Sequence, residues 1–433
     1  MAPVAPVEDR SHRGLLPRLR TRAECSIRAV GVLVGVVAVV LRPACVWPAS
    51  LSDILPRFVR GPAGSRNTGS VSDALVGALS TSVARATPVL GASAGFVYHF
   101  DWETGTFERE PSLFGQFYIE GADPIGRRRL NLSVSYQRVQ IDTLQGKDIR
   151  NLTDTQAPIP AQGLPGGLTI PRFGMALDTQ QVTVGATYGV TDDLEVNVAL
   201  LVLQSDFEVD TSFGLRTSGA RGARGCPCGV LFPPSKAQAS AIGVGDVLLR
   251  GKYRLLAQPW LHLAAGLIVR TPTGNDDDFQ GTGAVEVAPM LYASREPFAV
   301  AQNLRFRPYI NAGFNFDAND VDGSEGRWGV GLDGVLGERF TLGIAALGRH
   351  PVNRLGPLQL FDITRVDLRT GRQFSAPLFG LSSGREDFYD FTVGGRVNVW
   401  RDRANLFANA VFPLNRAGAR ADVIPLAGGE VTF

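Results

Sequence analysis

The sequence predicts a transmembrane antiparallel up-and-down β-barrel of about twelve strands, with a short helix before it. Three features of the 433-residue chain predict this fold: an N-terminal apolar segment too short to cross a bilayer, a period-two alternation of apolar and polar residues, and connections that segregate by length. The mean hydropathy of +0.05 fits a barrel or a soluble protein, and it excludes a polytopic helical membrane protein.

Residues 1–50 are expected to be a signal peptide. An apolar run of 13 residues at 29–41 follows five arginines between positions 13 and 28. A spanning helix needs about 20 apolar residues, so this basic region and short apolar run predict a cleaved leader. Arg42, Pro43 and Trp47 interrupt the small residues of a cleavage motif, which places cleavage only between about 44 and 60. An uncleaved anchor is the alternative.

Residues 51–90 are interpreted as a linker and a short amphipathic helix. Positions 51–69 are rich in Pro, Gly, Ser and Arg, and predict a linker without packed structure. In residues 70–85, Val71, Leu75, Leu79 and Val83 recur at helical spacing. The apolar face of this helix needs a partner. A cap on the periplasmic end of the barrel is favoured over a plug in its rim or lumen.

Residues 91–433 are assigned to the barrel, with clear alternation from about residue 128. In residues 305–316, Phe306 and Ile310 fall on one face, and Arg305 and Arg307 fall on the other. Segments of about ten residues suffice for a tilted strand to cross an outer membrane. Twelve strands are expected at 128–141, 178–190, 194–208, 241–256, 260–271, 282–293, 303–316, 325–336, 339–349, 386–400, 403–413 and 420–433.

The connections between these strands sort by length. Short or moderate links at 191–193, 258–260, 293–302, 337–338 and 401–402 alternate with links that include three very long ones, at 142–177, 209–240 and 351–385. Short periplasmic turns and long outer loops are typical of outer-membrane barrels, whereas a soluble sandwich has no reason to segregate its loops in this way. Segments 91–100 and 112–120 could add a hairpin around residues 103–105, which would raise the count to fourteen.

The chain ends at Phe433 on an amphipathic segment, with Val431 on the same face. A last strand with a terminal aromatic residue resembles the sorting signal that the barrel assembly machinery reads. Together with the leader, it predicts a bacterial outer-membrane location, with outer-membrane lipid and lipopolysaccharide as surroundings.

Several stretches resemble a family of Gram-negative outer-membrane barrels described as transporters and linked by name to the meta-cleavage pathway of phenol degradation. The resemblance covers most of the chain from about residue 90, and it implies a single barrel that lets small compounds through, aromatic ones among the candidates. It carries over no binding residue. The stretches are residues 183–203, 243–255, 269–291, 309–316 and 412–433.

A set of basic residues occupies the alternate positions of the expected strands whose side chains point into the barrel. A charge facing lipid at the midplane would cost roughly 2–4 kcal/mol, so these residues are expected to line the lumen or lie near its rims. Two interpretations stay open: they pair with inward acids such as Asp246 and Glu195 and fill a narrow barrel, or they make the lumen prefer anionic solutes. The residues are Arg250, Lys252, Arg254, Arg270, Arg305, Arg307 and Arg396.

The sequence does not favour catalysis. Of His99, His262 and His350, only His350 falls where a lipid-facing active site would be, and no recognisable Ser or Asp motif accompanies it; no cofactor is expected. The near-neutral balance (formal net charge +2) and export argue against nucleic-acid binding.

Two small clusters also receive structural interpretations. Asp276, Asp277 and Asp278 are expected in a solvated outer turn rather than a calcium site, because no loop of calcium-binding spacing surrounds them. Cys226 and Cys228 make a loop-tip disulfide at best, and no metal site is expected.

The function that follows is a monomeric or homo-oligomeric (trimeric) outer-membrane channel for passive uptake or release of small organic solutes. Two alternatives come from other classes: a closed structural or adhesive barrel, and a lipid-modifying enzyme centred on His350.

Overall fold

The structure is a computed structural model. It describes residues 50–54, 71–86, 97–101, 106–110 and 119–433, with gaps at 151, 158–165, 222–226, 232–234, 320, 338, 353–357, 367–372, 382–385 and 401–403. The predicted signal peptide lies outside the described residues, except for Ser50.

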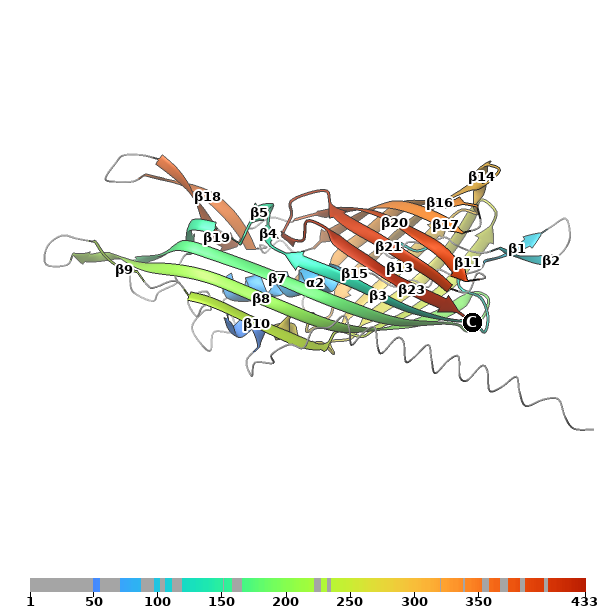
Figure 1. The fold of residues 1–433 in the computed structure, drawn as a ribbon, viewed down its shortest axis with the longest axis horizontal. Helices are drawn as coiled ribbons and strands as arrows, with labels where there is room; N and C mark the ends of the chain where they lie inside the picture. The colour runs from blue at the N-terminus through green and yellow to red at the C-terminus, as the bar shows by residue number, and fades with distance from the viewer. Residues whose placement is uncertain are drawn as a thin grey trace, which may run out of the picture. The chain divides into compact units, whose positions relative to one another are not determined.

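The described strands close into a twelve-stranded antiparallel barrel of the outer-membrane type (Figure 1), as predicted. Each wall strand pairs with the next, and the last pairs with the first. One wall strand is interrupted at residues 245–247, and both of its halves pair with β8. The wall consists of β3 (Leu130–Ile141), β7 (Gly166–Gly189), β8 (Leu194–Arg221), β10 (Ser235–Val244) continued by β11 (Leu248–Gln258), β12 (Leu261–Arg270), β13 (Glu286–Ser294), β15 (Leu304–Asp317), β16 (Glu325–Leu336), β17 (Phe340–Pro351), β20 (Phe388–Trp400), β21 (Ala404–Pro413) and β23 (Ile424–Thr432).

The extra hairpin does not join the wall. β1 (Val97–Asp101) and β2 (Thr106–Glu110) form a separate two-stranded sheet, so the fourteen-strand alternative is wrong. The second strand of this hairpin also precedes the expected segment 112–120, most of which lies outside the described residues. Ile119 and Glu120 are not in a strand: Ile119 packs against Tyr309 and Ala345, and Glu120 contacts the buried Arg250.

Two of the expected long loops contain much strand. β7 and β8 remain paired out to Gly166 and Thr217, far beyond the expected ends at 178 and 208. Antiparallel strands form hydrogen bonds with each other inside or outside a membrane, and the pairing of β7 with β8 continues past Pro171 with a register shift between Thr169 and Arg172. Shorter strands accompany these extensions: β4 (Thr143–Leu144), β5 (Lys147–Asp148), β6 (Leu152–Ala157), β9 (Pro227–Leu231), β18 (Leu358–Val366), β19 (Gln373–Leu381) and β22 (Ala419–Arg420), with β14 (Phe298–Ala301) in the moderate link at 293–302.

The helical elements are few in the described part of the chain. They are η1 (Leu51–Ile54), α2 (Val71–Ala86), η2 (Asp276–Asp278) and η3 (Val321–Gly323). No described helix is long and apolar enough to cross a membrane. The predicted amphipathic helix at 70–85 matches α2 closely.

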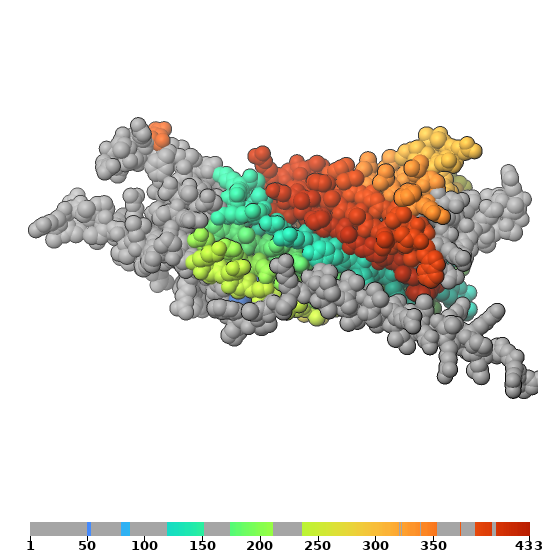
Figure 2. Space-filling model, viewed as in Figure 1, coloured from blue at the N-terminus to red at the C-terminus, as the bar shows by residue number. Residues whose placement is uncertain are grey.

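The barrel wall is apolar outside and polar inside. On β3, Leu132 is 40% exposed, whereas Asn131, Ser133, Ser135 and Gln137 are buried. Many wall strands show the same arrangement, with apolar side chains outside and polar side chains inside. It is the reverse of a soluble protein, because the outside of the wall faces lipid. In Figure 2 the side chains of β20, β21 and β23 form a continuous surface on the face shown.

The main apolar cluster lies inside the barrel, toward the end that carries the long connections. Leu79 and Val83 of α2 are almost completely buried there, against wall residues that include Ile141, Leu177 and Phe207. Leu51 of η1 belongs to the same cluster, so at least this part of the expected unstructured linker is packed. The core of the molecule is therefore a helix inside the barrel.

Candidate functional site

Helix α2 contacts strands on different sides of the barrel, which places it in the lumen. The amide of Gln137 on β3 donates to the carbonyl of Ala86 at 3.1 Å, and Arg270 on β12 donates to the carbonyl of Ala84 at 2.9 Å. Ser82 donates to the carbonyl of Ala419 at 2.8 Å. The expectation of a periplasmic cap is therefore wrong, and the alternative of a plug is correct. In the part of α2 whose side chains are described, Leu79, Val83 and Ala86 pack against wall residues of several strands.

The end of α2 carries an ion pair with the wall. Arg85 contacts Glu325 on β16 directly, lies 4.0 Å from Glu286, and donates to the carbonyl of Gly323 at 2.9 Å. The side chains of Arg85 and Glu325 are only 7% and 1% exposed. Charged groups this deeply buried are costly unless paired, so this contact fixes the position of the helix.

The acidic turn at the loop end holds the N-terminal segment. Asp278 accepts from the backbone amide of Leu51 at 2.8 Å, and the hydroxyl of Ser52 donates to Asp277 at 3.3 Å. The hydroxyl of Ser80 on α2 donates to the carbonyl of Asp276 at 3.1 Å. These three aspartates thus dock η1 and α2, a role that their sequence pattern did not indicate.

Arg250 and Lys252, both predicted to line the lumen, lie in a buried ion-pair cluster. Arg250 contacts Glu120 directly and Glu195 at 3.0 Å, and Lys252 lies 3.1 Å from Glu195 and 3.4 Å from Glu120. The ammonium group also stands 5.8 Å from the centre of the Tyr292 ring. The two bases and two acids balance in charge.

A second cluster forms around Asp123. Its carboxylate contacts Arg307 directly and lies 2.6 Å from Nδ1 of His262. Burial by itself would raise the pKa of Asp123, but Arg307 and the hydrogen bond with His262 outweigh it and hold the pKa well below the usual range. Arg254 lies 3.8 Å from Asp123 and pairs with Asp193 at 2.7 Å.

The remaining predicted bases lie on other strands. Arg270 is 3.5 Å from both Asp246 and Glu286, and Arg396 is 3.5 Å from Glu430. Arg305 is half-buried opposite Val335. The inward acids named from the sequence are among the partners: Glu195 pairs with Arg250 and Lys252, and Asp246 pairs with Arg270.

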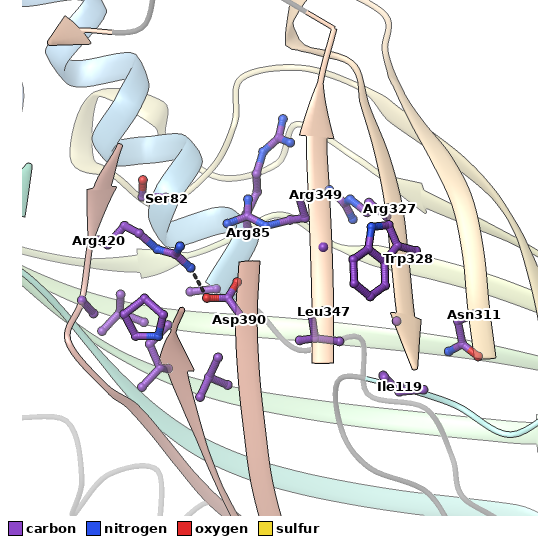
Figure 3. Close-up of a pocket in the computed structure, with 18 of the residues that line it drawn as sticks. Ser82, Arg85, Ile119, Asn311, Arg327, Trp328, Leu347, Arg349, Asp390 and Arg420 are labelled. Atoms are coloured by element: carbon purple, nitrogen blue, oxygen red, sulfur yellow. Dashed lines mark hydrogen bonds and ion pairs between the residues drawn. The ribbon is translucent and has the colours of Figure 1, made fainter. Parts of the chain in front are cut away.

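A cavity of about 160 Å³ lies between α2 and the wall. Its charged lining consists of Arg85, Arg327, Arg349 and Arg420 with a single acid, Asp390. Figure 3 draws the four arginines toward the top of the cavity, and Ile119 and Leu347 below them. The rest of the lining is largely apolar and includes Val139, Ile141, Ile268, Met290, Val411 and Ile424.

Sequence reasoning missed the four cavity arginines. The parity of the strands could have found two of them, because Val330 and Leu332 face outward on β16 and place Arg327 inward, as Ile344 does for Arg349 on β17. Parity also places a third, Arg420, inward, because the expected strand 420–433 has the buried Glu430 and Thr432 on the same face. Arg85 could not be found by parity, because it belongs to the plug.

The histidines occupy different environments. His262 is buried with Asp123, and its Nε2 lies 3.6 Å from Glu296. His350 accepts a hydrogen bond from the indole of Trp328 at 2.9 Å, and its Nδ1 lies 2.9 Å from Asp387. The side chain of His99 lies outside the described part, as does Cys226. For Cys228, only its backbone place in β9 is described.

No protein-family model and no curated protein matches the sequence. Several solved structures are similar in fold. One is an outer membrane channel from Pseudomonas putida F1, with 13% identity and a TM-score of 0.41, covering 72% of this chain and 98% of that one. The NanC porin has 7% identity and a TM-score of 0.35, covering 70% and 99%. The CymD monoaromatic hydrocarbon channel has 8% identity and a TM-score of 0.32, covering 71% and 89%. At these identities the likeness concerns the barrel fold alone.

Proposed function

We propose that the protein is a bacterial outer-membrane channel that passes small organic solutes by facilitated diffusion, without a cofactor and without catalysis. The observation that carries the proposal is the combination of an apolar outer surface, a polar inner face and a cavity within a closed wall. Such a wall is suited to a membrane, and a cavity with convergent polar groups is suited to a solute.

In this proposal most of the predicted basic residues line the lumen as members of ion pairs. Arg250, Lys252, Arg270, Arg307 and Arg396 are buried, and each has a carboxylate within ion-pair distance. A base that is already paired attracts an anion only weakly. We therefore place any preference for anions at the cavity arginines rather than at this set.

A closed structural barrel is the second candidate, and a specific observation favours it. α2 and the segment with Glu120 and Asp123 both make contacts across the lumen. A plug of this kind can either seal the barrel permanently or open during transport.

Planar-bilayer conductance of the refolded mature chain tests the two candidates, with the reversal potential read in a salt gradient. Discrete conductance steps support the channel. If the wild type shows no conductance and Arg85→Met shows discrete conductance steps, the protein is a channel that the plug closes. Silence of both proteins, each shown to be folded by heat-modifiable migration in gels, would favour the structural barrel and overturn the proposal.

The third class, a lipid-modifying enzyme, centres on His350 and Asp387 near the loop end of the wall. The channel proposal expects the lipid profile of cells that produce His350→Ala to equal that of cells with the wild type. A profile that changes with this variant alone, but not with His262→Ala, would support the enzyme.

We also propose that Phe433 acts as the assembly signal. Its backbone continues the wall through two hydrogen bonds with Leu130, and its side chain is 64% exposed. Phe433→Ala should lower the amount of barrel in the outer membrane without changing the stability of the refolded protein. Equal amounts of the two proteins in the membrane would refute this role.

A further inference from the structure

The cavity beside α2 holds more positive than negative charge. Four guanidinium groups meet three carboxylates among the described residues there: Asp390 in the lining, and Glu325 and Glu286 behind it. Glu325 is shared: it contacts Arg85, lies 2.6 Å from Arg327 and lies 3.9 Å from Arg349. Glu286, which lies 4.0 Å from Arg85, is also paired with Arg270.

Some donors of these arginines have no acceptor in the described part of the chain. Nη2 of Arg327 and Nε of Arg85 are buried and lack a hydrogen-bond partner among the described residues. An unsatisfied donor of a buried cation is costly. These two atoms do not face the cavity space, so an anion bound there removes the cost only if the guanidinium groups turn toward it.

The other side of the cavity has the opposite character. Ile119 and Leu347 belong to an apolar cluster with Tyr309 and Ala345, and Val139 and Ile141 belong to the cluster around α2. A small inorganic anion would satisfy the arginines but leave this apolar surface uncovered. An uncharged hydrocarbon would cover the surface but leave the donors unmet.

We propose that this cavity is a binding site for a small organic carboxylate that has an apolar body, such as an aromatic acid. The carboxylate would accept the fork of N–H groups that Arg327 and Arg349 present, since guanidinium and carboxylate match in bidentate geometry. The body would lie against Ile119 and Leu347. This inference rests on the proposed channel function and deepens it, because it names the chemical class of the solute and the place where it pauses in the lumen.

Isothermal titration of the refolded full chain in detergent micelles tests the site, with benzoate as the probe. We expect saturable binding of benzoate, and binding of acetate and of benzyl alcohol at least about tenfold weaker, equivalent to about 1.4 kcal/mol. Titrations into empty micelles remove partitioning. Equal binding of benzoate and benzyl alcohol would refute the role of the arginines, and equal binding of benzoate and acetate would refute the role of the apolar side.

Variants locate the site. Arg327→Gln and Arg349→Gln should each weaken benzoate binding by at least about tenfold, whereas Arg339→Gln, at an exposed arginine of the same barrel, should leave it unchanged. Arg349 makes the longer contact with Glu325, so its variant remains informative if the loss of Arg327 impairs folding. Wild-type affinity in a folded Arg349→Gln protein would overturn the proposal.

The failures of the two proposals are distinguishable, because binding is measured without a membrane. Conductance without benzoate binding overturns the site and leaves the channel. Binding without conductance, in the wild type and after Arg85→Met, overturns the channel and leaves a lumenal carboxylate site.

Discussion

Replacing Arg85 by methionine should release the plug. Methionine is unbranched and apolar, so it occupies similar space without the charge. The change removes one buried ion pair with Glu325 and one hydrogen bond to the carbonyl of Gly323. Breaking a buried pair typically costs about 3–5 kcal/mol, because the remaining charge is left alone.

For Arg85→Met we expect the loss of docking free energy to be smaller than this range. Glu325 keeps Arg327 at 2.6 Å and Arg349 at 3.9 Å after the change, so its charge is not orphaned. Hydrogen bonds to charged groups contribute roughly 1.5–3 kcal/mol, and we take about 2–3 kcal/mol for the loss. This free energy shifts the equilibrium between docked and undocked α2 by about 30- to 150-fold.

Single-channel recording in planar bilayers measures this shift as open probability. Arg85→Met should open far more often than the wild type, whereas Arg339→Met, at an exposed position outside the lumen, should behave like the wild type. The reasoning fails if Arg85→Met, folded as judged by heat-modifiable migration, shows the same open probability as the wild type.

Three further predictions concern the plug, the lumen and the wall. Leu79→Ala should weaken the docking of α2 by about 2–5 kcal/mol because the side chain is fully buried, and limited proteolysis should then cut the N-terminal segment while the barrel stays intact. The lowered pKa of Asp123 means that its pair with Arg307 stabilises the protein above about pH 4 and that this stability is lost as the pH falls further. Urea midpoints measured at pH 7 and pH 3 should therefore differ more for the wild type than for Asp123→Asn, and equal differences would contradict this. Val330→Arg, near the middle of β16, should cost about 2–4 kcal/mol in vesicle refolding, whereas Leu336→Arg at the strand end should cost at most about 1 kcal/mol; equal costs would mean that the two positions do not differ in depth.

Most of the wall was predictable because the residues of a membrane-spanning strand alternate between the lipid and the lumen. Alternation with period two places Leu132 outside and Asn131 inside without any knowledge of the partner strands, and the expected strand at 325–336 matches β16 exactly. Residues beyond the membrane need not alternate in this way, so the alternation does not show where a strand ends. The hairpin of β7 and β8 therefore continues past the expected ends.

The candidate site was only partly predictable. Strand parity predicted that Arg250 and Arg307 face the lumen or lie near its rims, but it could not show that Glu120 and Asp123 neutralise them. Those acids come from a segment outside the wall, and its path through the barrel depends on tertiary contacts. Of the four cavity arginines, only Arg85 lies outside the expected strands, but their convergence on one cavity depends on tertiary contacts.

The sequence by itself determined where most of the wall strands lie and which side of the wall their residues face, because these follow from the pleat of a single strand and the contrast between lipid and lumen. It left the strand count at twelve or fourteen, and the structure decided for twelve. Only the tertiary structure decided what fills the lumen. The apolar face of α2 fits a periplasmic cap or a plug equally well as a pattern, and the choice depends on contacts with residues far away in sequence, such as Glu325 for Arg85 and Phe207 for Leu79. The free energy of those contacts arises from burial and pairing across the barrel, which no local pattern of residues records.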